Sequence, residues 1–158
     1  MTTEKVAFVG LGVMGYPMAG HLSGTSLGVT VYNRTDSRAQ QWLQTFSGEK
    51  AATPAETAAD ADIVCLCVGN DDDVRSVVYG ETGILAGLKK GAILIDHTTA
   101  SPQLAKELEL AVSEAGSEFL DAPVSGGQAG AENRSLTIMV GGNQAPFNIA
   151  KDVMNVYA

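Results

Sequence analysis

Close to the start of the chain, an apolar segment runs directly into a glycine-rich turn, and this junction limits the fold more than any other feature. Residues 6–9 are Val-Ala-Phe-Val, and the pattern Gly-x-Gly-x-x-Gly follows at residues 10–15. A segment compatible with a helix comes next, at residues 17–22. Strand, glycine turn and helix in this order form the context in which the pattern binds the pyrophosphate of a dinucleotide.

The three glycines have different expected roles in such a turn. Gly10 allows the chain to turn tightly, Gly12 lets the main chain approach the pyrophosphate, and Gly15 allows the helix to pack closely on the strand. Free N–H groups and the dipole at the start of the helix then favour phosphate charge. The residues predicted to hold a dinucleotide here are Gly10, Leu11, Gly12, Val13, Met14 and Gly15.

Apolar strand-like segments alternate with helical patterns along the whole chain. Strands are expected at residues 6–9, 29–32, 51–52, 63–68, 92–95, 119–122 and 136–140. The main helices are expected at residues 17–22, 37–46, 54–59, 71–78, 102–115 and 145–156. Such alternation is typical of βαβ units, so we expect an α/β fold with a Rossmann-type, doubly wound and mostly parallel sheet. No linker interrupts the pattern, so residues 1–158 are expected to form one dinucleotide-binding domain.

The composition argues against several classes of partner. The formal net charge is -8 and no basic patch is present, so we expect neither nucleic acid nor a membrane surface as a partner. No apolar window is long enough for a spanning helix. Residues 1–5 lead straight into the first strand and leave no room for a secretory signal, so a cytoplasmic location is expected.

The two cysteines lie two residues apart, at Cys65 and Cys67. In a strand both would lie on one face, about 6.6 Å apart, which is poorly suited to a disulfide. Neither histidine is close in sequence, so no metal site is expected. We therefore expect both thiols to be small buried apolar groups.

The residues after the second expected strand predict which dinucleotide is preferred. An acidic residue about 20 positions beyond the glycines commonly accepts hydrogen bonds from the ribose 2′-hydroxyl of NAD. Here that place holds Asn33, Arg34 and Thr35. A guanidinium attracts a 2′-phosphate, so the sequence favours NADP over NAD. The alternative is that Arg34 is only a solvated turn residue.

At this point the chain resembles a known family, the β-hydroxyacid dehydrogenases, which include 3-hydroxyisobutyrate dehydrogenase. The resemblance covers essentially the whole chain, and the segment Asp-Ala-Pro-Val-Ser-Gly-Gly at residues 121–127 is more specific than the glycine pattern. Further matching segments are residues 10–19, 33–35 and 96–102. The resemblance implies reversible hydride transfer between a nicotinamide and the β-hydroxyl carbon of a small carboxylic acid, or reduction of a semialdehyde.

The resemblance also implies roles for individual residues. Cys67 and Val68 would contribute main chain beside the adenosine half of the cofactor, and Thr99 would lie near the nicotinamide ribose. A substrate carboxylate would be bound by Ser125, Gly126 and Gly127, for which the residues alone favour an ordinary turn.

Two departures from the family pattern affect what the chain is expected to do. Arg134 stands where the family has a glycine, so the turn there is altered if it requires a positive φ. The family's catalytic lysine lies in a helix beyond residue 158, so no catalytic residue is assigned, and the helical C-terminal domain is expected to be absent. Packing, rather than replacement of that lysine, is the expected role of His97.

Three functions therefore remain open. The first is an NADP-dependent β-hydroxyacid dehydrogenase, and the second is a catalytically inactive NADP-binding module that is truncated before the lysine. The third is an enzyme of the imine-reductase type, which shares the glycine turn and the Asn-Arg-Thr segment, although residues 121–127 suit a carboxylate substrate better. A homo-oligomer is a further expectation, because apolar surface left uncovered by a missing domain would favour self-association.

Overall fold

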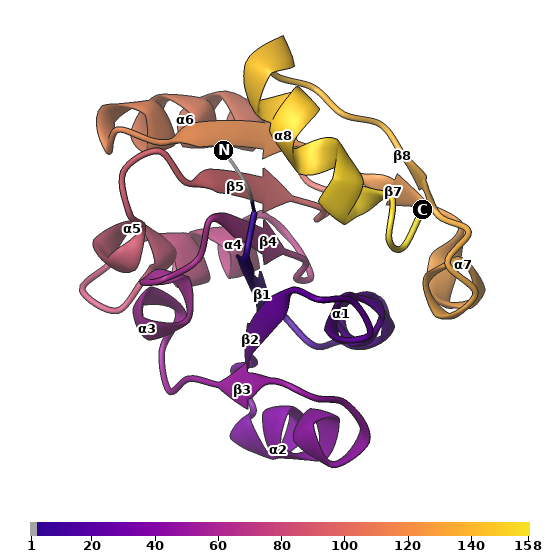
Figure 1. The fold of residues 1–158 in the computed structure, drawn as a ribbon. Coiled ribbons are helices and arrows are strands. Elements are labelled where there is room, and N and C mark those ends of the chain that lie inside the picture. The colour runs from indigo at the N-terminus through magenta and orange to yellow at the C-terminus, as the bar shows by residue number, and fades with distance from the viewer. Residues whose placement is uncertain (1–2) are drawn as a thin grey trace.

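The computed structural model describes residues 3–158, which form one main sheet with helices on both faces (Figure 1). The strands of this sheet are β1 (Lys5–Val9), β2 (Gly28–Tyr32), β3 (Glu49–Lys50), β4 (Ile63–Leu66), β5 (Ile93–Asp96) and β6 (Glu118–Asp121). All are parallel, and their order is β3-β2-β1-β4-β5-β6. The order reverses between β1 and β4, as in Rossmann domains, and confirms the expected doubly wound α/β fold.

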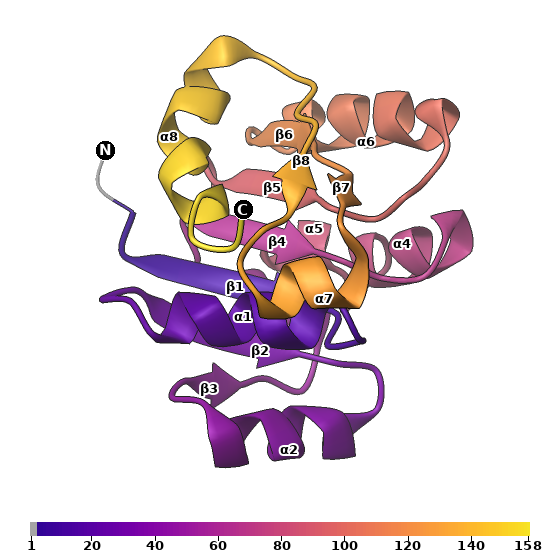
Figure 2. The ribbon, with the colours of Figure 1, turned by 90° about the vertical axis from the view of Figure 1, so that its right-hand side faces the viewer.

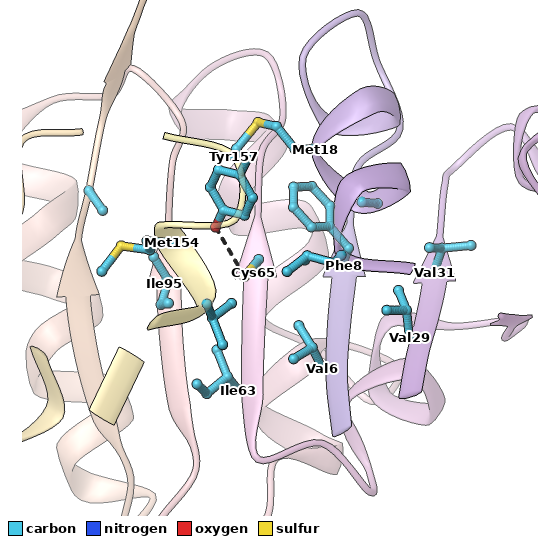
Figure 3. Close-up of a cluster of buried hydrophobic side chains, with 14 of the residues drawn as sticks. Val6, Phe8, Met18, Val29, Val31, Ile63, Cys65, Ile95, Met154 and Tyr157 are labelled. Atoms are coloured by element: carbon cyan, nitrogen blue, oxygen red, sulfur yellow. Dashed lines mark hydrogen bonds between the residues drawn. The ribbon is translucent and has the colours of Figure 1, made fainter. Parts of the chain in front are cut away.

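Side chains of the central strands alternate between two buried clusters. Val6 and Phe8 pack with the helices α1 (Gly15–Ser23), α2 (Asp36–Thr45) and α8 (Gln144–Met154) (Figures 1 and 3). Ala7 and Val9 face the other cluster, which the helices α3 (Pro54–Ala58), α4 (Asp71–Val78), α5 (Ile84–Gly87) and α6 (Pro102–Glu114) cover. Because both faces are buried, the central strands are apolar throughout rather than alternating.

Three helices on the second face begin with side chains that cap their free N–H groups. Thr53, Asn70 and Ser101 accept hydrogen bonds from main-chain N–H groups in the first turns of α3, α4 and α6. Such caps stabilise a helix by about 1 kcal/mol each.

Two expected strands differ from the structure. The third strand is Glu49–Lys50 instead of residues 51–52, although the Ala51 N–H still donates to the Val31 carbonyl over 3.1 Å. Residues 136–140 do not enter the main sheet. Instead β8 (Thr137–Ile138) pairs antiparallel with β7 (Val124–Ser125), because the chain turns back through α7 (Gly127–Glu132). The apolar character of residues 136–140 does not identify the strand with which they pair.

The helix α7, which connects β7 to β8, lies beside α1 (Figure 2). The His21 Nε2 on α1 donates to the Ala131 carbonyl over 2.8 Å and fixes α7 on α1. The end of α7 has a main-chain conformation that usually requires glycine. Arg134 has φ 55°, and the Ser135 N–H donates to the Gly130 carbonyl over 2.9 Å. This 6→1 bond belongs to the Schellman ending of a helix. The turn therefore does require a positive φ and is formed in spite of Arg134.

Candidate cofactor site

One cavity of about 340 Å³ lies where β1, β2 and β4 end and α4 begins. Such volumes are typical of small-molecule sites, and this edge of a doubly wound sheet is the usual place for a ligand. Ten residues that the sequence predicted for cofactor binding line it: Gly10, Gly12, Val13, Met14, Gly15, Asn33, Arg34, Thr35, Cys67 and Val68.

The three glycines of the turn differ in their surroundings, as expected from the sequence. Gly10 has φ 102°, and a Cβ there would overlap the Cys67 carbonyl. A Cβ on Gly15 would overlap the Gly10 carbonyl and lie 2.9 Å from the Phe8 ring, so this glycine allows α1 to pack on β1. A Cβ on Gly12 would meet nothing within 4 Å. The space beside Gly12 therefore faces the cavity, where a pyrophosphate can approach the main chain.

The start of α1 provides hydrogen-bond donors to the same cavity. Met14, the residue before the helix, makes no side-chain capping bond. Within the described chain, no acceptor is placed on the N–H groups of Gly12, Val13 or Met14. Together with the helix dipole, these donors form a site suited to a phosphate.

Asn33 joins the glycine turn to the end of β2. Its Oδ1 accepts the Leu11 N–H over 3.0 Å, and its Nδ2 donates to the Thr35 carbonyl over 3.1 Å. The Leu11 carbonyl accepts Arg38 Nε over 2.7 Å, and the Arg38 guanidinium lies 4.0 Å from the centre of the Tyr16 ring. Asn33 and Arg38 thus hold the turn in shape, a structural role that the sequence did not predict for either.

The side chain of Arg34 is available to a ligand. It is 82% exposed, and its Nη1 lies 3.8 Å from Asp73 Oδ1 on α4. This is long for an ion pair at a surface and adds little stability. A guanidinium held this loosely can turn toward an anion that enters the cavity.

Five predicted residues lie outside the cavity lining. The side chain of Leu11 is buried in the core, and its main-chain N–H, in the glycine turn, donates to Asn33. Thr99 is exposed after β5, and Ser125, Gly126 and Gly127 are exposed where β7 meets α7. The structure therefore brings ten of the twelve expected cofactor residues together in the cavity lining, but it places Thr99 and the three expected substrate residues outside it.

One wall of the cavity was missed at the sequence level. Asp73, Ser76 and Val77 of α4 line it, as does Gly69 after β4. The sequence contained only the helical pattern of residues 71–78, in which Asp73 and Ser76 resemble ordinary surface residues. Only the packing of α4 next to the end of β4 turns them toward the cavity.

The two cysteines are free thiols on the side of the sheet that α1 and α8 cover. Burial raises the pKa of Cys65 and of Cys67 to about 12. Thiols with such a pKa remain protonated at neutral pH and are poor nucleophiles. Within residues 3–158, no three His, Cys, Asp or Glu side chains are close enough together to bind a metal ion.

His97 lies in a buried hydrogen-bonded chain rather than in the cavity. Its Nδ1 is 2.7 Å from the Ala122 carbonyl, and its Nε2 is 2.7 Å from the Tyr157 hydroxyl, which lies 3.7 Å from Cys65 Sγ (Figure 3). A carbonyl only accepts, so Nδ1 carries the proton, and Nε2 accepts from Tyr157. The Tyr157 oxygen then accepts from the Cys65 thiol. Burial lowers the pKa of His97 to about 4, so it is neutral near pH 7, which agrees with the expected packing role.

Carboxyl groups gather at the ends of β5 and β6. Burial, with a smaller contribution from the neighbouring Asp121, raises the pKa of Asp96 to about 6. The Asp96 Oδ1 accepts the Thr98 N–H over 2.9 Å, while Thr98 Oγ1 accepts the Val68 N–H over 3.0 Å. This network connects the loop after β5 to a wall of the cavity.

Comparisons with known proteins agree with this arrangement. Residues 5–158 match the family model described as the NAD binding domain of 6-phosphogluconate dehydrogenase. An uncharacterized oxidoreductase of Shewanella frigidimarina is 57% identical over 154 residues, which are 98% of this chain and 53% of that protein. The mitochondrial 3-hydroxyisobutyrate dehydrogenase of Mus musculus is 37% identical over 150 residues, 94% of this chain and 44% of the mouse protein. The chain thus spans about half the length of the curated relatives it matches.

Solved structures give the same result. A Mycobacterium tuberculosis 3-hydroxyisobutyrate dehydrogenase with L-serine superposes with a TM-score of 0.92 at 32% identity, over 100% of this chain and 53% of that one. A structure of Psf3 in complex with NADP+ and 2-OPP gives a TM-score of 0.91 at 27% identity, over 97% of this chain and 54% of that one. A Streptomyces aurantiacus imine reductase, at 24% identity and a TM-score of 0.86 over 98% of this chain and 53% of that one, shares the fold.

No helix in residues 3–158 combines the length and the apolar character that crossing a membrane requires.

Proposed function

The chain belongs to the family of NAD-binding domains found in 6-phosphogluconate and 3-hydroxyisobutyrate dehydrogenases, and from this membership we propose that it binds NADP(H) for an oxidoreductase of the 3-hydroxyisobutyrate dehydrogenase type. The observation that carries the proposal is a single cavity lined by both the glycine turn and Arg34.

The residues present fit a dinucleotide. Gly12 leaves open space for the pyrophosphate, and the N–H groups at the start of α1 can donate hydrogen bonds to phosphate oxygens. Arg34 is suited to a 2′-phosphate, because a guanidinium forms charge-assisted and potentially bidentate hydrogen bonds. When bound, the nicotinamide supplies or accepts the hydride. The protein's own part is to fix the cofactor at the carboxyl edge of the sheet.

The proposed substrate is a small carboxylic acid bound at Ser125, Gly126 and Gly127. These residues are exposed at the start of α7, where main-chain N–H groups and a hydroxyl can hold a carboxylate. Support also comes from the relatives of 3-hydroxyisobutyrate dehydrogenase type. A substrate of the imine-reductase kind would not need this carboxylate site.

A second candidate function is a module that binds the cofactor without turnover. One observation favours it: among the described residues, no lysine lines the cavity that could protonate a substrate oxygen. Lys89 precedes β5, at the edge of the sheet opposite to the cavity, and is paired with Asp62 over 2.7 Å.

Calorimetric titration of the folded chain with NADPH and NADH tests the proposal. NADPH should bind, and Arg34→Ala should weaken it by about 1–3 kcal/mol, the cost of losing a charge-assisted contact. The affinity for NADH should stay within about twofold. Binding of neither cofactor would refute the proposal, and equal weakening of both would remove the role given to Arg34.

Turnover distinguishes the enzyme from the inactive module. NADP-dependent oxidation of 3-hydroxyisobutyrate, or reduction of succinic semialdehyde, by this chain would establish the enzyme. Cofactor binding with no turnover of any such acid or semialdehyde would favour the module. Turnover of a cyclic imine instead would favour the imine-reductase alternative.

A further inference from the structure

Two side chains of opposite charge face each other across the cofactor cavity. Among the described residues that line it, Arg34 is the one cation and Asp73 is the one anion. Their nearest charged atoms, Arg34 Nη1 and Asp73 Oδ1, are 3.8 Å apart. The lining therefore carries no net charge, although a 2′-phosphate would need a positive site.

We propose that Asp73 is a specificity-determining residue that pairs with Arg34 and opposes binding of a 2′-phosphate, so that the cavity accepts NAD(H) as well as NADP(H). The inference rests on the proposed function, since it assigns the cofactor preference of the same site. It reduces the preference for NADP over NAD that Arg34 alone predicts.

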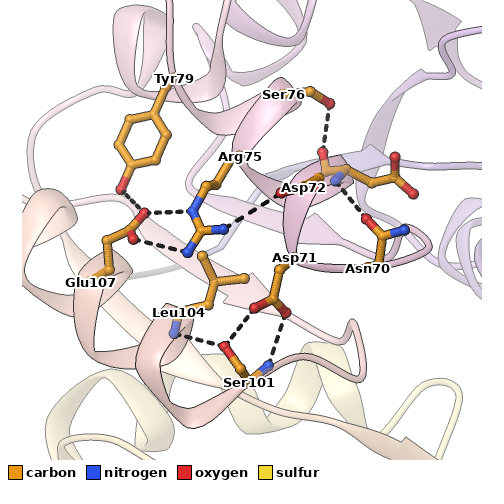
Figure 4. Close-up of polar contacts among 10 residues, drawn as sticks. Asn70, Asp71, Asp72, Arg75, Ser76, Tyr79, Ser101, Leu104 and Glu107 are labelled. Atoms are coloured by element: carbon orange, nitrogen blue, oxygen red, sulfur yellow. Dashed lines mark hydrogen bonds and ion pairs between the residues drawn. The ribbon is translucent and has the colours of Figure 1, made fainter.

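The main chain of α4 holds Asp73 in position. Its N–H donates to Asn70 Oδ1 over 2.9 Å, and its carbonyl accepts Ser76 Oγ over 2.7 Å. Asn70 is the cap residue directly before α4, and Ser76 lies within the helix (Figure 4). The carboxylate lies against Gly69, in the loop between β4 and α4. A Cβ built on Gly69 would be 2.5 Å from Asp73 Oδ2. Gly69 thus leaves the space that the carboxylate occupies at the cavity wall.

This position gives the carboxylate two effects on a cofactor. It competes for the guanidinium that a 2′-phosphate needs, and it repels the phosphate directly. In contrast, a ribose 2′-hydroxyl can donate a hydrogen bond to a carboxylate, which is how acidic residues favour NAD. NAD-binding Rossmann domains commonly place that acid after β2, whereas here the acid comes from α4 on the facing wall.

The neighbouring Asp72 provides a matched control. It lies in the same first turn of α4 and has the same charge, but its side chain is 96% exposed and lies 3.7 Å from Arg75 (Figure 4). It does not line the cavity. Removing either charge costs the helix a similar interaction with its dipole, so only the place of the charge differs between Asp72→Asn and Asp73→Asn.

The test is calorimetric titration of NADPH and NADH into the wild type, D73N and D72N. D73N should increase the affinity for NADPH by about fivefold to tenfold, as expected for removing a like charge at a partly exposed site. The affinity of D73N for NADH should fall or stay within about twofold of the wild type. D72N should change the affinity for each cofactor by less than about twofold.

Three results would overturn the inference: an equal change of both cofactors in D73N, tightening of NADPH by D72N as large as that by D73N, or weaker NADPH binding to D73N. In each case the wild type still binds a cofactor, so the proposed function stands. A wild type that binds neither cofactor would refute the proposed function itself, and this inference with it.

Discussion

Gly10 and Gly12 differ in what a methyl group would meet, although both belong to the same turn. At Gly10 the main chain has φ 102° and a Cβ would overlap the Cys67 carbonyl. At Gly12 the nearest heavy atoms are more than 4 Å away. The first glycine is therefore needed to fold the chain, and the second is needed to admit a ligand.

Alanine substitutions should separate these two roles. Gly12→Ala should keep the free energy of unfolding within about 0.5 kcal/mol of the wild type, but it should weaken NADPH by at least about tenfold, because the methyl group occupies the pyrophosphate's approach. Gly10→Ala should lower the free energy of unfolding by several kcal/mol, roughly 2 or more. Urea denaturation and cofactor titration measure the two effects, and a destabilised Gly12→Ala protein with normal affinity would contradict the assignment.

Arg134 tolerates a conformation that glycine adopts without strain. Its φ of 55° belongs to the left-handed region, which costs a residue with a side chain roughly 1–2 kcal/mol. The residue is exposed, and its side chain makes no hydrogen bond or ion pair within the described chain. The side chain therefore does not compensate the strain.

Arg134→Gly should raise the free energy of unfolding by about 1 kcal/mol, since the gain of relaxed φ outweighs the added freedom of the unfolded chain. Chemical denaturation gives the value, and Arg134→Ala serves as the control because it removes the charge but keeps the strain. If alanine stabilised the protein as much as glycine does, the effect would come from charge and not from φ.

At the scale of helices and strands, the sequence predicted the alternating strands and helices of the main sheet but not the pairing of the short elements β7 and β8 or the helix α7. The central strands were found because both of their faces are buried, which makes them continuously apolar. The hairpin strands β7 and β8 have two residues each, too few for an alternating pattern. The short helix α7 begins at a glycine pair that resembles a turn.

The site was predicted to a similar extent. The glycine turn and the segment after β2 have motifs at a fixed spacing, so their residues could be placed in advance. Asp73 and Ser76 have no such motif, because their role comes from the packing of α4 beside β4. The buried bond between His97 and Tyr157 joins residues 60 positions apart, and no local pattern encodes it.

The ends of β5 and β6 contain two groups whose titration has opposite effects on stability. The pKa of Asp96 in the folded state is raised to about 6. Its contribution to the free energy of unfolding is therefore complete below about pH 4 and is lost as the pH rises toward 6. His97 has a folded pKa lowered to about 4, so its contribution is present above about pH 6.5 and is lost as the pH falls toward 4. Each amounts to about 3 kcal/mol, so the two largely cancel between pH 4 and 6.

Asp96→Asn should remove one of these opposing effects. The amide oxygen can still accept the Thr98 N–H, while the buried negative charge is gone. The free energy of unfolding of D96N minus that of the wild type should therefore grow as the pH rises from about 4 to 6.5, by up to about 3 kcal/mol. Urea denaturation at pH 4.5 and 7.5 measures it, and a difference that is equal at both pH values would contradict a raised pKa.

At the scale of the whole molecule, the cavity joins segments that are distant in the chain. Its walls come from the turn after β1, the end of β2, the loop after β4 and the helix α4, all within one sheet edge. A ligand that contacts all of them binds only the folded state. Cofactor binding should therefore stabilise the fold as a whole.

Saturating NADPH should raise the melting temperature. At a free concentration of about 100 times the dissociation constant, the gain is about 2.7 kcal/mol, which corresponds to roughly 5–10 °C for a chain of this size. Differential scanning calorimetry measures the shift, with Arg34→Ala at the same NADPH concentration as the control. An unchanged melting temperature for the wild type at concentrations where titration shows saturation would contradict binding to the native state alone.

Tyr157 is fully buried between His97 and Cys65, although it follows them by 60 and 92 residues in the chain. The two strands that it contacts, β4 and β5, are synthesised much earlier. During translation, His97 Nε2 has no internal partner until residue 157 has left the ribosomal exit tunnel. The buried contacts of Tyr157 with His97 and Cys65 therefore form only after residue 157 has emerged, and a nascent chain stalled before that point holds an incomplete core.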